Sequence, residues 1–175
     1  MKKATIYASK TGVEFTPATV VKGNGSRELK TGRIKIRAFS MEEKGKMVYV
    51  FLTPMEAHKL GRYLEGITTL SEAKKLKPII HKLEKDGEET VSTVEVERWV
   101  SKDGKKSGYA IVVSRDKESI NIPMDKDTVL YLADFLKALS IEQSWEQVRK
   151  IEKAGEEVEE VAEDDEIPED IEDAF

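Results

Sequence analysis

The hydrophobic positions between Lys30 and Leu64 follow first a two-residue period and then a helical one. Apolar and polar residues alternate in 33–39 and again in 47–52, which predicts two strands that each bury one face. The segment Thr53-Pro54-Met55-Glu56 then has the form of a capping box with proline at the first helical position. It predicts a helix whose apolar stripe covers the buried face of the strands. That stripe consists of Ala57, Leu60, Gly61 and Leu64.

The other face of these two strands carries cations and aromatic rings. The residues predicted to share it are Arg33, Lys35, Arg37, Phe39, Tyr49 and Phe51. On an uncovered sheet such a set forms a stacking surface for unpaired bases, with the cations available for phosphates. The alternative is an ordinary two-sided sheet in which Tyr49 and Phe51 pack under a second layer and the cations are merely solvated.

A similar pattern returns 72 residues later, so the chain reads as one module written twice. The matched pairs are Val48/Ile120, Val50/Ile122, Leu52/Met124, Leu60/Leu132, Gly61/Ala133 and Leu64/Leu136. Asn24-Gly25 and Asp103-Gly104 lie between extended runs, as is typical of tight hairpin turns. We therefore predict an α+β fold of antiparallel sheets backed by helices, built from two similar strands-then-helix halves.

The halves are expected at about 3–66 and 88–139 of a domain that spans 1–153. Between them, apolar residues recur every three to four positions, which predicts a connecting helical segment over 67–87, kinked at Pro78. The stripe of this segment would be Leu70, Ala73, Leu76, Ile80 and Leu83.

Four further structural expectations concern the ends of the two halves. Tyr7 and Phe15, in the first strands, are expected in the core. Asp125 or Asp127 is expected to cap the second long helix. The segment 141–153 is expected to continue as a short helix.

Further candidates for nucleic-acid binding lie near the two predicted hairpin turns. Lys22 and Arg27 flank or form the first turn. Trp99, on the more polar side of its strand, precedes the second turn and is the best stacking candidate of this half. The basic residues after it are Lys102, Lys105 and Lys106. The alternative for Trp99 is a contact between subunits.

The net charge of −5 hides a strong division along the chain. Residues 154–175 hold twelve acids and no base, which is the composition of a disordered acidic tail, with weak helix as an alternative over 156–162. All 29 bases and the remaining 22 of the 34 acids fall in residues 1–153, which therefore carry a charge of +7. A basic body with an acidic tail favours a polyanionic ligand for the body and leaves the tail for another role.

Composition and motifs argue against catalysis. The absence of cysteine excludes disulfides, thiolate metal sites and a cysteine nucleophile. The two histidines, His58 and His81, lie among lysines, and no phosphate-binding loop, dinucleotide fingerprint or metalloprotease motif is present. We expect no enzymatic activity, cofactor or metal site. The lack of a secretory signal and of a membrane-length apolar run predicts a cytoplasmic protein, and the richness in Lys and Glu resembles heat-adapted proteins.

The tail mixes its acids with apolar residues, which a purely solubilising tail does not need. The candidate partner-binding residues are Asp164, Asp165, Ile167, Pro168, Ile171, Asp173 and Phe175. The ring and the α-carboxylate of the last residue suit a partner pocket that holds an apolar end and surrounds it with Arg or Lys. The alternative is a solubilising tail with incidental apolar residues.

The tail resembles the acidic tip of bacterial-type single-stranded DNA-binding proteins, which ends in acidic residues, Ile-Pro and a final Phe. Asp164-Asp165-Glu166-Ile167-Pro168 and Phe175 match in kind, although six residues separate the proline from the phenylalanine. In that family the tip recruits replication and repair proteins, and the resemblance implies the same partners here.

The body, over Lys3 to Leu139, is similar in pattern to the Whirly family and to the coactivator positive cofactor four. This resemblance implies antiparallel sheets backed by helices that bind single strands as homodimers or homotetramers. The lysine-rich strand motif of Whirly proteins is not intact, and residues 30–36 are its nearest equivalent. The divergent single-strand binders of hyperthermophilic archaea are another family that the pattern resembles.

These features predict a sequence-nonspecific single-stranded DNA-binding protein of replication and repair, whose tail recruits partner enzymes. RNA is an alternative ligand, because stacking and phosphate contacts do not report the 2′-hydroxyl group. Two other functions remain open. One is a transcriptional cofactor of the same fold, and the other is an acidic-tailed scaffold or chaperone that does not bind nucleic acid.

Overall fold

The first half of the chain forms an antiparallel sheet with the strand order β1-β2-β3-β4, followed by a helix. The computed structural model describes residues 2–22, 29–85 and 88–159. The elements of this half are β1 (Ala4–Tyr7), β2 (Thr11–Lys22), β3 (Leu29–Ser40), β4 (Met47–Leu52) and α1 (Pro54–Ile67).

The second half is again an antiparallel sheet followed by a helix, with the strand order β5-β7-β8-β9 and with β6 also paired to β7. Its elements are β5 (Lys74–Lys75), β6 (Ile79–Lys85), β7 (Glu88–Val100), β8 (Ser107–Arg115), β9 (Glu118–Met124) and α2 (Lys126–Glu159). The predicted fold class, two strands-then-helix halves with antiparallel sheets, is confirmed. No helix among the described residues is long and apolar enough to cross a lipid bilayer.

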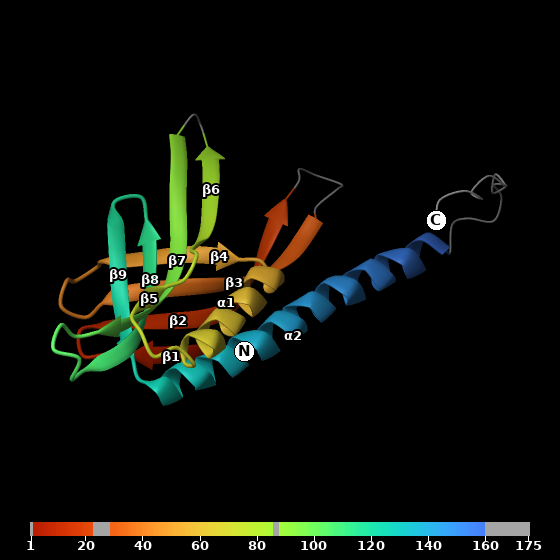
Figure 1. Cartoon of the computed structure of the whole chain (residues 1–175). Coiled ribbons are helices and arrows are strands. Elements are labelled where there is room, and N and C mark those ends of the chain that lie inside the picture. Colours follow the sequence, from red (N-terminus) through yellow and green to blue (C-terminus); the bar gives the residue numbers. More distant parts are fainter. Residues whose placement is uncertain (1, 23–28, 86–87, 160–175) are drawn as a thin grey trace, which may run out of the picture.

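One hydrophobic core joins both sheets and both helices. The strands of the two sheets cross each other, and the helices lie side by side along one flank of the sheets (Figure 1). The apolar positions of the β3–β4 alternation are all at most 2% exposed: Ile34, Ile36, Ala38, Val48, Val50 and Leu52. The predicted alternation is therefore confirmed, and it fixes which side chains of the first sheet point outward.

Both helices begin at the predicted caps. In α1, Thr53 Oγ1 accepts from the Glu56 N–H at 3.2 Å and Glu56 Oε2 accepts from the Thr53 N–H at 2.8 Å, which completes the capping box. In α2, Asp125 Oδ1 accepts from the Thr128 N–H at 2.8 Å. This backbone hydrogen bond lowers the pKa of Asp125. The carboxylate is thus the form that stabilises the start of α2.

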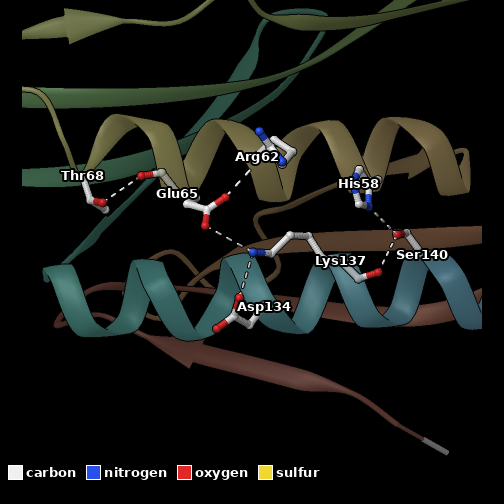
Figure 2. A network of polar contacts seen from close by, with 7 residues as sticks. All are labelled: His58, Arg62, Glu65, Thr68, Asp134, Lys137 and Ser140. Atoms are coloured by element: carbon white, nitrogen blue, oxygen red, sulfur yellow. Dashed lines mark hydrogen bonds and ion pairs between the residues drawn. The ribbon is translucent and has the colours of Figure 1, made fainter.

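Polar side chains of α1 and α2 contact each other across the boundary between the two helices (Figure 2). Lys137 of α2 pairs with Asp134 at 2.9 Å and reaches Glu65 of α1 at 3.6 Å. The hydrogen bond to Asp134, followed by the charges of both carboxylates, raises the pKa of Lys137. One turn away, Ser140 Oγ lies 3.4 Å from His58 Nδ1. The contacts tie the two helices together at the surface.

The predicted connecting helix over 67–87 is wrong, because the chain forms strands at β5 and β6 instead. Pro78 lacks an N–H and disfavours helix in the residue before it, whereas the edge of β7 offers ladder hydrogen bonds to the residues that follow. The apolar residues of this segment do not form one helical face. Leu70 and Leu76 pack against the core from a loop, while Ile80 is 51% exposed.

The predicted start of the tail at residue 154 also needs correction. Helix α2 runs without a break from Lys126 to Glu159, so it absorbs the short helix expected at 141–153 and the first six residues of the predicted tail. Ala and Glu favour helix and no proline interrupts this stretch, so the helix continues where charge alone suggested a tail. In Figure 1 the C-terminal part of α2 extends away from the sheets.

Candidate nucleic-acid interface

The outer face of the first sheet brings together all six residues predicted for it on β3 and β4. The strand register places Lys35 opposite Phe51 and Arg37 opposite Tyr49. Directly opposed side chains on one face of an antiparallel pair lie close enough to interact. Each cation of the two pairs therefore has an aromatic ring as its neighbour on the next strand.

The two rings of β4 are open to solvent. Tyr49 is 40% exposed and Phe51 is 38% exposed, so the alternative of a second layer over them is wrong for the described chain. The rings meet edge to face, with centroids 6.0 Å apart. An exposed pair of rings at this spacing offers faces for stacking without a change in the fold.

Lys35 is the central cation of this face. Its Nζ lies 5.5 Å from the centroid of Tyr49 and 6.0 Å from that of Phe51. No carboxylate pairs with Lys35 in the part of the chain that the structure describes. By contrast, Arg37 pairs with Glu14 of β2 at 3.4 Å. Lys35 therefore has its charge available for a phosphate, whereas part of the charge of Arg37 is already compensated.

The Phe39 ring packs over its neighbour Gly12 on β2. A Cβ atom on Gly12, its partner on β2, would fall 2.4 Å from the Phe39 ring, so only glycine leaves room for the ring there. Tyr7 of β1 meets Phe39 edge to face at 6.0 Å and is 69% exposed. The expected core position is confirmed for Phe15, which is fully buried, and is wrong for Tyr7. Tyr7 lies at the end of the short edge strand β1, on the same side of the sheet as Phe39, where its ring faces solvent.

Trp99 repeats this arrangement in the second sheet. A Cβ atom on Gly108, its partner on β8, would lie 2.7 Å from the indole ring, and Trp99 is 38% exposed. The ring lines a hollow of about 640 Å³ that reaches Ser9 in the turn after β1. The exposed loop behind it carries Lys102, Lys105 and Lys106. None of the ring or ion contacts among the described residues links this group to the outer face of the first sheet.

The outer face of the second sheet is otherwise acidic and polar. Glu97 pairs with Lys75 at 3.2 Å and accepts from Asn121 at 3.3 Å. The hydrogen bond to Glu97, followed by its charge, raises the pKa of Lys75. The charge of Lys75 is therefore already compensated, so the first sheet, where Lys35 has no carboxylate partner among the described residues, is the stronger candidate surface.

Arg115, at the end of β8, is the residue that the sequence analysis missed. Its guanidinium carbon lies 4.9 Å from the centroid of Tyr49 on β4. The two residues are far apart in sequence and belong to different sheets, so no local pattern predicts their contact. The remaining predicted binding residues lie outside the described residues or have undescribed side chains: Lys22, Arg27, Asp164, Asp165, Ile167, Pro168, Ile171, Asp173 and Phe175.

Solved structures with this fold include the plant transcriptional regulator PBF-2, with 14% identity and a TM-score of 0.51 over 79% of this chain and 80% of that chain. WHY3 from Arabidopsis thaliana has 17% identity and a TM-score of 0.55, covering 89% of this chain and 96% of that one. WHY1 from the same plant has 16% identity and a TM-score of 0.56, covering 88% of this chain and 92% of that one. The fold is therefore Whirly-like, as the sequence resemblance predicted. No protein-family model and no curated protein sequence matches the chain.

Proposed function

We propose that this protein binds single-stranded DNA without catalysing a reaction on it, through the outer face of its first sheet. The observation that carries the proposal is the row of exposed rings and cations on β3 and β4, with Lys35 between Tyr49 and Phe51 and without a carboxylate partner among the described residues. Unpaired bases stack on exposed rings, and the cations neutralise the phosphates between them. The Whirly-like fold supports the same function.

Binding of this kind has little sequence preference, because every base has a π-face and no base-edge reader is needed. The phosphate contacts come from Arg33, Lys35 and Arg37, with Lys22, Arg27, Lys102, Lys105 and Lys106 as further cations. The stacking residues are Phe39, Tyr49, Phe51 and Trp99. RNA remains an alternative ligand, because neither contact type reads the 2′-hydroxyl group.

The first test is fluorescence anisotropy of labelled poly-dT, poly-dA and a matched duplex across a salt series. We expect tighter binding to both single strands than to the duplex, since paired bases offer no face to the rings. If the three cations of β3 each neutralise one phosphate, the logarithm of the affinity should fall with that of the salt concentration with a slope of about −2. Equal affinity for the duplex, or no binding at all, would contradict the proposal, and the latter would favour the scaffold function.

We further propose that the acidic tail competes with DNA for the basic face and recruits replication and repair proteins. A variant that ends at Glu159 keeps α2 whole and removes the rest of the tail. We expect it to bind single strands more tightly at low salt, and the gain to vanish near 1 M salt, where charges are screened beyond about 3 Å. Unchanged affinity at low salt would contradict the competition.

A matched control separates the two roles of the tail. The double variant Ile167→Ala/Phe175→Ala keeps every acid of the tail. It should bind DNA as the full chain does and fail to capture replication and repair proteins in a pull-down. If it captures them as well as the full chain, the apolar residues are not the recruiting element.

A second candidate function is transcriptional regulation through the same surface, which is favoured by the similarity to PBF-2, a plant transcriptional regulator. The two functions differ in the partners they require. A tail that captures transcription factors would favour regulation, whereas capture of replication and repair proteins would favour the first proposal. For either function, assembly into a homodimer or homotetramer would join several sheet faces along one strand and raise the overall affinity above that of a single face.

A further inference from the structure

The guanidinium group of Arg115 lies at the junction of the two sheets, above a ring of the proposed DNA-binding face. Its central carbon is 4.9 Å from the centroid of Tyr49, the shortest cation–ring distance among the described residues. A planar guanidinium can stack on an aromatic face, which a lysine ammonium cannot do. The contact therefore covers part of the Tyr49 ring and presents a second planar group beyond it.

Among the described residues, the ring of Tyr49 is the one side-chain partner found for Arg115. Other arginines of the two sheets have partners: Arg37 pairs with Glu14, and Arg98 donates to the hydroxyl of Tyr109 at 2.8 Å. No ion pair or hydrogen bond of the Arg115 side chain is found among the described residues. Its contact with the Tyr49 ring does not use the donors of its guanidinium.

A hollow of about 450 Å³ lies beside this stack. It is lined by Met47, Val48, Tyr49, Arg115, Asp116, Lys117 and Glu118. The volume lies within the range of about 300–1,000 Å³ that is usual for small-ligand sites. The hollow lies at the edge of the first sheet, because the edge strand β4 supplies one of its walls.

The other wall of the hollow is held in place by the backbone. In the turn after β8, the Asp116 N–H donates to the Val91 carbonyl at 2.8 Å, and Asp116 Oδ1 accepts from the Val91 N–H at 3.0 Å. Asp116 also adopts a positive φ of 53°, which Asp tolerates better than most residues. The turn is thus tied to β7 and keeps Arg115 in position over the ring.

The charges around the hollow select the part of a nucleotide that fits it. The two acids of the lining, Asp116 and Glu118, balance its two bases, Arg115 and Lys117, so the hollow has no net charge to attract a phosphate. The Arg115 plane and the apolar atoms of Met47 instead suit a flat, neutral group. We infer that Arg115 is a stacking residue that holds one unpaired base in this hollow, in the order Tyr49 ring, guanidinium, base. The inference rests on the proposed single-strand binding and adds a base site formed by both sheets.

The test compares Arg115→Ala, Arg115→Lys and Lys117→Ala in the full chain. Each alanine variant removes one cation from the same turn, but the ammonium of Lys117 lies over no ring among the described residues. On poly-dT, we expect Arg115→Lys to lose roughly tenfold in affinity, as for one stacked base, and Arg115→Ala to lose somewhat more, because it also loses the charge. Lys117→Ala should lose about twofold at low salt, as an exposed charge does. Melting temperatures check that all three variants fold.

A strand of the same length without bases isolates the stacking from the charge. On this strand Arg115→Lys should bind as the unchanged protein does, because only phosphate contacts remain. If Arg115→Lys keeps full affinity for poly-dT, or if Arg115→Ala matches Lys117→Ala, the residue acts as a charge and the inference is wrong. If the unchanged protein does not bind poly-dT, the proposed function itself fails and the base site fails with it.

Discussion

Replacing Lys35 and Tyr49 together by alanine is expected to lower the affinity for single-stranded DNA by about 100-fold, since one stacked base and one phosphate contact are lost. The two side chains form one unit, with the Lys35 Nζ 5.5 Å from the Tyr49 centroid. Tyr49 also supports Arg115, so the loss is expected to exceed the roughly tenfold loss of the Arg115→Lys variant. Anisotropy with poly-dT measures the effect.

The matched control is Lys59→Ala with Tyr131→Ala. It removes the same two residue types from exposed positions, Lys59 on α1 and Tyr131 on α2, where the tyrosine is 58% exposed. Surface substitutions of this kind change stability by only about 0.5 kcal/mol, so both double variants should fold. The control should bind poly-dT as the unchanged protein does. An equal loss in both variants would show that general charge, and not the outer face of the first sheet, drives binding.

Features encoded by short-range patterns were predictable from the sequence. The two-residue period of β3 and β4 places their cations and rings on one face, because each side chain of a strand must alternate with the next. The caps at Thr53 and Asp125 were equally clear, since a capping side chain acts on backbone groups two to three residues away. These features do not depend on how the sheets meet.

Features that depend on contacts between distant segments were not predictable. Arg115 reaches Tyr49 only because the ends of β8 and β4 approach each other when the sheets cross. Residues 79–85 form a strand because they pair with the edge of β7. These backbone hydrogen bonds outweigh the helical spacing of the apolar residues in the segment. The exposed Tyr7 was misjudged for the same reason, as its burial depends on whether anything covers the first sheet.

The duplication in the sequence has a structural counterpart at the helix crossing. Gly61 of α1 and Ala133 of α2 occupy equivalent positions of the two halves. They lie in close contact between the helices, where a Cβ atom on Gly61 would be 2.9 Å from the Ala133 carbonyl oxygen. Small residues at both positions let the two backbones come together. The crossing thus positions the helices that cover the inner face of the sheet opposite the proposed DNA surface.

Gly61→Ala is therefore expected to destabilise the protein by about 1–3 kcal/mol, as overpacking of a tight contact does. The new methyl group would meet the Ala133 carbonyl at 2.9 Å and the Cγ of Lys137 at 3.0 Å. The lysine can move, but the carbonyl belongs to the backbone of α2, so the helices must separate. This cost exceeds the gain of up to about 1 kcal/mol that alanine brings to a helix.

Gly66→Ala is the matched control, because it makes the same change in the same helix. Nothing lies within 4 Å of a Cβ atom at Gly66. We expect it to be neutral or to stabilise by about 0.5–1 kcal/mol through the reduced freedom of the unfolded chain. The unfolding temperature should therefore fall for Gly61→Ala and stay the same or rise for Gly66→Ala, by about 2–4 °C per kcal/mol for a chain of this length. Equal shifts would mean that α1 and α2 do not cross at Gly61 and Ala133, and that the duplicated helices meet elsewhere.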